Sequence, residues 1–349
     1  MTVSASKSDR PTVSEHDPFR LDRYRLLQAA LLSLRAGPAL VLALLIIVIS
    51  LTTPIFFTTR NIGNVFSQTS VIAVIALGQL LVIVTRGIDL SVGSTIALSG
   101  VTGAVVFEHT HSSVLVVAAI LGTGLAVGAV NGLVYVYGRV PHPFIVTLAT
   151  LSIVRGIALW ASNGTLVPNM PPIVQTIGGG SISWLPYSTF VVVGVALCCL
   201  LLTTWLVWGR WLYAVGGNPE AARRSSIPTR RVLVSVYVLS GLAAGIGGLL
   251  TAGLIDGGSP TAGDLSELDS IAAVIIGGAA FAGGRGNVGN ALVGAFTIGV
   301  IRNALNLHNV DPFYQLMAIG VIVLSAVEVD VLRGYIEERV RVAQAARIA

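Results

Sequence analysis

The chain has 349 residues, of which 54% are hydrophobic and 11% are charged. A soluble domain carries about 25% charged residues, so this composition excludes an ordinary soluble protein and indicates that the membrane is the solvent. The only lysine is Lys7, so the chain has no P-loop of the form G-x-x-x-x-G-K-[ST] and does not bind ATP through one. The two cysteines, Cys198 and Cys199, are neighbours in an apolar run and suit neither a metal site nor a structural disulfide.

Apolar runs recur along the chain and predict an all-α polytopic membrane protein, because a helix needs ~20 apolar residues to cross a ~30 Å hydrocarbon core. We predict ten membrane segments: 38–57, 66–85, 94–107, 113–137, 143–161, 188–209, 232–254, 270–282, 288–306 and 313–331. The third and the eighth are short, so we expect them to be broken or re-entrant helices. Residues 38–331 then form one transmembrane domain between an N-terminal tail, 1–37, and a C-terminal tail, 332–349.

The basic residues predict the orientation, because cytoplasmic loops carry an excess of Lys and Arg. With the N-terminus inside, 18 of the 21 basic residues fall on the inner side. Arg60 and Arg302 fall outside, and Arg155 lies within the fifth segment. Both termini are therefore predicted to be cytoplasmic. The net charge of +5 is then an inner-face excess and not a nucleic-acid patch. The first apolar run ends in SLTTP without a small-residue cleavage site, so we expect this segment to remain as an anchor.

The polar stretch TRGIDLSVGS separates the second predicted segment from the third. Gly87 and Gly93 are expected to let the backbone turn sharply, and Asp89 or Ser91 to cap the next helix. Arg86 and Asp89 are close enough in sequence to form a pair. A capped turn that breaks the helix is therefore predicted. A proton or ion site is the alternative, but the other intramembrane acids that a proton relay needs are missing.

The inner loop 211–231 contains a short helix with clear start and stop signals. Asn218 is a good N-cap and Pro219 suits the first helical position, whereas Ile227 precedes a proline that stops the helix. We predict that this helix docks another protein; a helix lying on lipid headgroups is the alternative, but it would want an apolar face. The residues assigned to docking are Gly217, Asn218, Pro219, Glu220, Ala221, Ala222, Arg223, Arg224 and Ile227.

Residues 276–299 are dense in glycine and alanine, which let membrane helices approach closely. Within them, Gly283, Gly284, Arg285 and Gly286 predict a tight inner turn. The same stretch matches G-x-G-x-x-G, but nucleotide binding needs a preceding strand and a βαβ unit. Here the motif joins two membrane segments, so nucleotide binding is excluded.

Three polar side chains inside predicted segments, Gln79, Asn131 and Arg155, are candidates for lining a translocation pathway. An intramembrane ionisable residue is a functional candidate by default. For Arg155, snorkelling to the outer interface or a structural ion pair is an equal alternative. For Gln79 and Asn131, hydrogen bonding between helices is the alternative.

Several stretches taken together resemble the membrane permease subunits of ATP-binding-cassette (ABC) importers for simple sugars, of the ribose, arabinose and xylose type. The similar stretches, in order, are 78–100, 140–159, 214–231, 266–295 and 310–327. The resemblance implies a multi-pass protein of the bacterial inner membrane, embedded in the lipid bilayer, that is a transporter subunit and not an enzyme. It also implies a homodimer, a cytoplasmic ABC ATPase and a periplasmic sugar-binding protein as partners, with no cofactor, metal or nucleic acid.

In the family that the chain resembles, the loop with the short helix couples to the ATPase. The chain departs from the family pattern at two positions: Ser226 stands where glycine is common, and Arg86 replaces the first glycine of T-G-G-I-D-L-S. Because of Ser226, the sequence does not determine at which residue the coupling helix ends. Rival functions are a branched-chain amino-acid permease, an ion-coupled secondary transporter and a passive channel.

Overall fold

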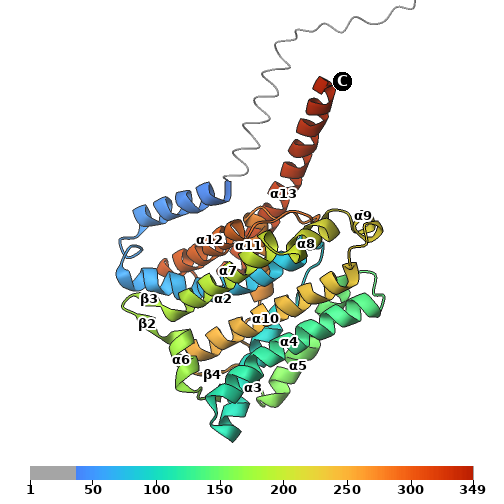
Figure 1. Ribbon diagram of the computed structural model, residues 1–349. Coiled ribbons are helices and arrows are strands. Elements are labelled where there is room, and N and C mark those ends of the chain that lie inside the picture. The colour runs from blue at the N-terminus through green and yellow to red at the C-terminus, as the bar shows by residue number, and fades with distance from the viewer. Residues whose placement is uncertain (1–36, 349) are drawn as a thin grey trace, which may run out of the picture. The chain divides into compact units, whose positions relative to one another are not determined.

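The computed structural model describes residues 37–348 (Figure 1). The predicted N-terminal tail, except for Gly37, lies outside the described residues. After an apolar helix at Gly37–Thr52, the helices are α2 (Thr59–Val84), α3 (Val92–Thr110), α4 (Ser113–Tyr137), α5 (Pro143–Ala161), α6 (Pro172–Gly179), α7 (Tyr187–Thr204), α8 (Val207–Gly217), α9 (Pro219–Arg224), α10 (Thr229–Ile255), α11 (Ser266–Ile276), α12 (Val288–Leu307) and α13 (Pro312–Ile348). The strands are β1 (Val167–Pro168), β2 (Ser181–Ile182), β3 (Leu185–Pro186) and β4 (Gly257–Gly258).

Seven described helices are long and apolar enough to cross a membrane: α2, α4, α5, α7, α10, α12 and the apolar part of α13. Each coincides with one of the ten predicted segments. The other three predicted segments coincide with shorter or more polar helices, namely Gly37–Thr52, α3 and α11. The all-helical class is therefore confirmed, whereas the count of ten crossings stays a prediction.

Several boundaries differ from those predicted, including the following three. The apolar run 188–209 is not one helix, because α7 ends at Thr204 and α8 begins at Val207. The run 270–282 ends as a helix at Ile276, after which the glycine-rich turn begins. The last helix, α13, does not stop at residue 331 but extends to Ile348. Apolar composition does not distinguish a helix from an apolar turn, which explains the first two differences.

The helix α10 packs along α4, α2 and α3 in the centre of the bundle. Glycines make the α4–α10 contact possible: a Cβ atom on Gly124 would collide with the Gly241 carbonyl, and one on Gly241 would collide with the Gly124 carbonyl. Small residues allow such close approach, which is how membrane helices gain van der Waals contact. As a result, most residues of α2 are buried in the core of the bundle.

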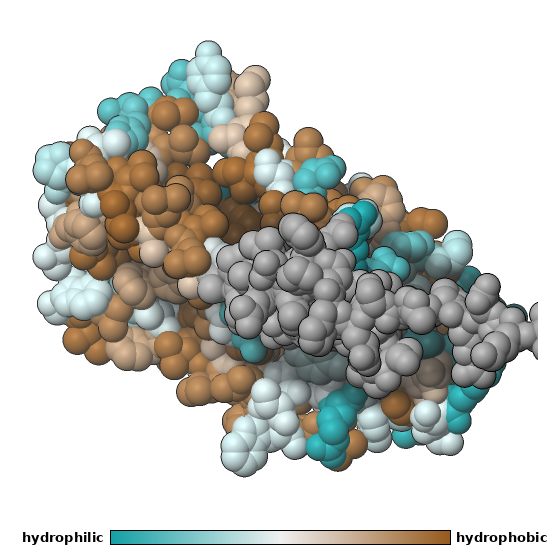
Figure 2. All heavy atoms as spheres, turned by 90° about the horizontal axis from the view of Figure 1, so that it is seen from above, coloured by the Kyte–Doolittle hydropathy of each residue, from teal (hydrophilic) through white to brown (hydrophobic). Residues whose placement is uncertain are grey.

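Large apolar side chains are exposed on α4, α5, α7 and α13. Figure 2 shows hydrophobic side chains over much of one face, with hydrophilic side chains in separate groups toward its edges. In water such surfaces would be costly, because burial of apolar area is worth about 25 cal/mol per Å². Their exposure fits a chain surrounded by lipid tails.

Short strands lie at the end of the bundle where α2 begins (Figure 1). β1 pairs antiparallel with β4, and β2 forms a hairpin with β3. The short helix α9 lies at the other end, close to where α2 ends (Figure 1). The helix α2 has 26 residues, so it separates these two ends by about 39 Å at 1.5 Å per residue.

Candidate functional site

The helix α9 has the start that its sequence predicts. The Asn218 side-chain oxygen accepts a hydrogen bond from the backbone N–H of Ala221 at 3.0 Å, and Pro219 occupies the first helical position. Glu220 forms ion pairs with Arg223 at 2.8 Å and Arg224 at 3.4 Å. All three charged side chains are more than half exposed. They therefore stand on a surface that another protein can reach.

The helix α9 ends at Arg224, which settles the helix end that Ser226 had left open. Ser226 has a backbone φ of 60°, in the left-handed region, and does not continue the helix. Only glycine adopts this region without a steric cost. The structure thus gives Ser226 the conformation of the glycine that the resemblance expects there. The N–H of Ile227 donates to the carbonyl of Ala222 at 3.1 Å and closes the helix end.

Arg86 joins the end of α2 to the residues just before α9. Its Nε atom donates to the Gly216 carbonyl at 2.6 Å, and its Nη2 atom donates to the Gly217 carbonyl at 2.5 Å. These carbonyls end α8, where the helix dipole favours a cation. Arg86 itself has a φ of 67°. It is the second position at which this chain places a side chain on a left-handed backbone where the resemblance expects glycine.

The predicted glycine turn packs against the same point. Gly283 and Gly284 have φ angles of 83° and 74°. The N–H of Gly284 donates to the Val84 carbonyl at the end of α2, at 2.8 Å. A Cβ atom on Gly216 would collide with that same Val84 carbonyl. The approach of these three backbones leaves no room for side chains.

A tyrosine adds a fourth contact, because the Tyr213 hydroxyl on α8 donates to the Gly286 carbonyl at 2.9 Å. We call this set the coupling junction: the end of α2 at Val84 and Arg86, the end of α8 at Tyr213, Gly216 and Gly217, and the glycine turn at 283–286. The sequence singled out the helix-breaking turn, the short helix and the glycine turn separately. The structure brings all three together.

The predicted pairing of Arg86 with Asp89 is wrong, because the two side chains have different partners. Asp89 is buried, and its Oδ1 atom accepts from the N–H of Ser91 at 3.0 Å and from its hydroxyl at 2.7 Å. The Oδ2 atom accepts from the Ser240 hydroxyl on α10 at 2.8 Å. Arg86 points instead toward α8. A buried carboxylate is retained here because hydroxyl and amide donors satisfy it.

The two glycines of the turn do not supply its sharpest backbone angle. The left-handed residue is Arg86, and neither Gly87 nor Gly93 has a positive φ. Gly93 lies inside α3, where a Cβ atom would collide with the Gly263 carbonyl and the Glu267 carboxylate. Its role is therefore close packing.

Two of the candidate pathway residues join the Asp89 network. Asn131 on α4 donates to the Ser91 hydroxyl at 2.8 Å. Gln79 exchanges two hydrogen bonds of 3.2 Å with the Asp89 backbone when its amide nitrogen faces the Asp89 carbonyl. Both side chains are fully buried. Their contacts favour the alternative of hydrogen bonding between helices over a pathway lining.

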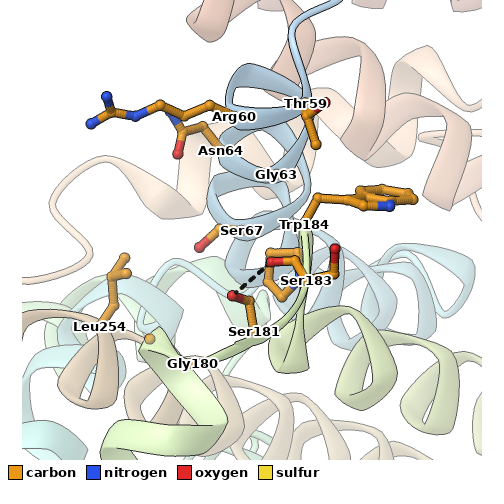
Figure 3. Close-up of a pocket in the computed structure, with 12 residues that line it drawn as sticks. Thr59, Arg60, Gly63, Asn64, Ser67, Gly180, Ser181, Ser183, Trp184 and Leu254 are labelled. Atoms are coloured by element: carbon orange, nitrogen blue, oxygen red, sulfur yellow. Dashed lines mark hydrogen bonds between the residues drawn. The ribbon is translucent and has the colours of Figure 1, made fainter.

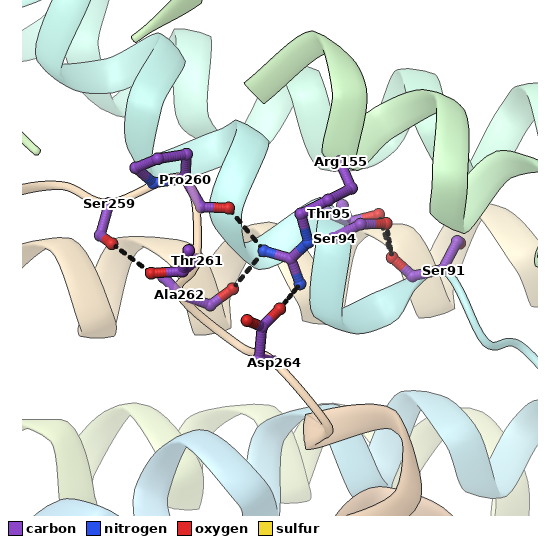
Figure 4. Close-up of polar contacts among 9 residues, drawn as sticks. All are labelled: Ser91, Ser94, Thr95, Arg155, Ser259, Pro260, Thr261, Ala262 and Asp264. Carbon is purple, nitrogen blue, oxygen red and sulfur yellow. Dashed lines mark hydrogen bonds and ion pairs between the residues drawn. The ribbon is translucent and has the colours of Figure 1, made fainter. Parts of the chain in front are cut away.

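The third candidate, Arg155, holds the loop that precedes α11 (Figure 4). Its Nη1 atom donates to the carbonyls of Pro260 at 2.7 Å and Ala262 at 3.0 Å, and its Nη2 atom lies 2.5 Å from an oxygen of Asp264. The Arg155 side chain is 18% exposed and that of Asp264 is 59% exposed. This geometry favours the structural ion pair over a pathway role.

Sequence reasoning missed Gly216, Tyr213 and the bonds that Arg86 makes. The doublet of Gly216 and Gly217 was a usable signal, since a glycine within a helix lowers its stability and marks close backbone approach. The bonds of Arg86 had no local signal, because their acceptors lie 130 and 131 residues away along the chain.

Comparison with known proteins decides the family. Residues 61–327 match the family described as "Branched-chain amino acid transport system / permease component". This chain belongs to that permease family. The permease is therefore a transporter component and not an enzyme. No solved structure was found to match it.

Curated relatives are similar over most of the permease. The ribose import permease protein RbsC of Escherichia coli K12 is 38% identical over 83% of this chain and 91% of its own length. The L-arabinose ABC transporter permease protein AraH of Azospirillum brasilense is 37% identical, covering 86% and 88%. The D-allose transport system permease protein AlsC of E. coli K12 is 36% identical, covering 84% and 90%.

Proposed function

We propose that the permease translocates a monosaccharide as the membrane subunit of an ABC importer. A periplasmic binding protein delivers the sugar, and a separate cytoplasmic ATPase supplies the energy. The proposal takes its substrate class from the relatives, whose names specify ribose, arabinose and allose, at 36–38% identity. The setting is the bacterial inner membrane, which suits the long apolar helices.

The coupling junction is the structural observation that best supports the proposal. An ATPase that moves α9 must pass that movement to helices that line the path. In the permease, α9 follows directly after Gly217, whose carbonyl is bound by Arg86 of the α2 end. The preceding residue, Gly216, lies against both Val84 and Gly284. A displacement of α9 therefore pulls on α2 and on the turn before α12 together.

Such a junction needs no covalent chemistry. ATP binding and hydrolysis in the partner shift α9, and the attached helices open the path to alternate sides of the membrane. Coupling of this kind is reciprocal, so docking of the binding protein outside must alter the turnover of the ATPase. We further propose that two copies of the permease form the path between them, as the resemblance implies.

A branched-chain amino acid is the second candidate substrate, because the family description names that transport system. An ion-coupled transporter would want several intramembrane acids. Of the buried acids Asp89, Glu267 and Asp269, Asp89 is bound by the hydroxyl groups of Ser91 and Ser240, and Asp269 is paired with Arg302 at 2.6 Å. A passive channel would move substrate without an ATPase. The three alternatives can be told apart by the substrate of the binding protein and by whether transport depends on an ATPase.

The test is reconstitution of the permease in proteoliposomes with its ATPase and binding protein. We expect sugar-loaded binding protein to stimulate ATP hydrolysis and ATP-dependent sugar uptake. Stimulation by binding protein loaded with leucine but not with ribose, arabinose or allose would favour the amino-acid permease. Uptake by the permease alone would indicate a channel and overturn the proposal.

A further inference from the structure

A cavity of about 560 Å³ lies at the start of α2, at the opposite end of this helix from the coupling junction (Figure 3). One wall is a face of α2, and the others are the β2–β3 hairpin, the end of α6 and Leu254 of α10. Binding pockets for small molecules have volumes of about 300–1,000 Å³, so this one is large enough for a monosaccharide.

The α2 wall presents four polar side chains. Arg60, Asn64 and Ser67 follow the i, i+4, i+7 spacing that places residues on the same side of a helix, and Thr59 stands at the start of α2. None of these side chains makes a hydrogen bond to another residue within 37–348. Their donors and acceptors are therefore available to a ligand.

The hairpin supplies the opposite wall. Figure 3 shows Ser181, Ser183 and Trp184 beside α2, with the Ser181 hydroxyl donating to the Ser183 carbonyl at 3.3 Å. Trp184 is 45% exposed, and its indole makes an edge contact with Phe66, with ring centroids 6.2 Å apart. A Cβ atom on Gly63 would lie 2.7 Å from the Trp184 carbonyl, so the hairpin rests directly on α2. The cavity is thus walled by contacting backbones and is not a gap between mobile loops.

The chemistry of this lining fits a neutral sugar. Hydroxyl and amide groups both donate and accept, as sugar hydroxyls do, and the Arg60 guanidinium offers further donors. A zwitterionic amino acid is held best where a cation faces its carboxylate and an anion faces its ammonium group. The lining contains one cation, Arg60, and no Asp or Glu. It therefore matches a neutral polyhydroxylated ligand more closely than a zwitterion.

We propose that this cavity is the outer receiving site, where a neutral monosaccharide released by the binding protein first contacts the permease. The inference rests on the proposed function and adds the residues that hold the sugar. Under the predicted orientation the start of α2 lies on the outer side, where the binding protein docks. The residues that carry the site are Arg60, Asn64, Ser67, Ser183 and Trp184.

The first experiment compares Asn64→Leu and Ser67→Leu with Gln68→Leu in the reconstituted importer. Gln68 is an exposed neighbour on α2 that does not line the cavity, so it controls for an added apolar side chain. We expect sugar uptake per ATP hydrolysed to fall at least tenfold in the two cavity variants and to stay unchanged in the control. Stimulated ATP hydrolysis should persist in all three. Unchanged uptake per ATP in both cavity variants would overturn the receiving site.

The second experiment needs no partner and uses wild-type permease in nanodiscs. Titration with ribose, arabinose and allose should change the tryptophan fluorescence, and the change should be lost in Trp184→Phe. Failure of all three sugars, or a response to a uronic acid alone, would overturn the inference. If instead wild-type ATP hydrolysis fails to respond to sugar-loaded binding protein, the proposed function fails, and that result is distinguishable because it precedes any cavity variant.

Discussion

The Nε atom of Arg86 donates to the carbonyl oxygen of Gly216 at 2.6 Å, although 130 residues separate the two along the chain. This bond fixes the end of α8 to the end of α2, three residues before α9 begins at Pro219. The position of α9 is therefore set by a cation from another part of the chain and not by its own six residues.

Gly216 and Gly217 are adjacent but should differ sharply in their tolerance of a side chain. A Cβ atom on Gly216 would collide with the Val84 carbonyl, whereas one on Gly217 meets nothing within 4 Å. We expect Gly216→Ala to lower the unfolding temperature by several degrees, since overpacking costs about 1–3 kcal/mol, and to reduce uptake. Gly217→Ala is the matched control and should resemble the wild type in a thermal-shift assay. Equal unfolding temperatures for the two variants would contradict the close approach.

Replacing Arg86 by glycine should destabilise the permease less than replacing it by alanine. Both substitutions remove two charge-assisted hydrogen bonds to backbone carbonyls, each worth about 1.5–3 kcal/mol. Glycine, however, removes the cost of a left-handed backbone, about 1–2 kcal/mol for other residues, which alanine keeps. We expect a lower unfolding temperature in detergent for Arg86→Ala than for Arg86→Gly, with both below the wild type. The reverse order would show that the φ of 67° is not what limits this position.

Ser226→Gly should stabilise the permease by about 1 kcal/mol, because Ser226 also has a left-handed backbone, with a φ of 60°. The neighbouring Ser225 has a φ of −85°, so Ser225→Gly gains nothing and should be neutral or slightly destabilising. Limited proteolysis within the loop between α9 and α10 is the readout. Greater protection in Ser225→Gly than in Ser226→Gly would refute this account of how α9 ends.

Charge changes on α9 should uncouple ATP hydrolysis by the partner from sugar uptake by the permease, without unfolding the permease. Glu220 and Arg223 are exposed, and surface ion pairs of this kind contribute about 0–1 kcal/mol. We expect Glu220→Ala and Arg223→Glu to insert and fold normally but to lose most of the ATPase stimulation by sugar-loaded binding protein. Wild-type uptake in both variants at equal expression would rule out α9 as the docking helix.

Arg155→Leu should weaken the loop before α11 far more than Asp264→Asn. The first variant removes the donors to two carbonyls as well as the ion pair, and an unsatisfied group costs about 1–3 kcal/mol. The second removes only the charge of a side chain that is 59% exposed, so we expect an effect of about 0.5 kcal/mol. Hydrogen exchange of the loop after α10 is the measurement. Similar exchange rates in the two variants would contradict the view that Arg155 holds this loop in place.

Much of the fold was present in local patterns. Each of the ten predicted segments coincides with a helix, because a run of apolar residues bounded by polar ones has few other ways to satisfy its backbone in lipid. The start of α9 was also predictable: an N-cap at Asn218 and a proline at Pro219 act on neighbouring backbone groups. These signals operate over one or two turns.

The sequence alone determined the helical membrane class and where several helices begin and end, because both depend on residues close together in the chain. Only the tertiary structure decided which polar groups meet. Arg86 and Asp89 are three positions apart, yet one binds α8 and the other binds α10. A buried charge is satisfied by whichever donors or acceptors the packing of distant helices brings near, and that choice is not encoded in sequence spacing.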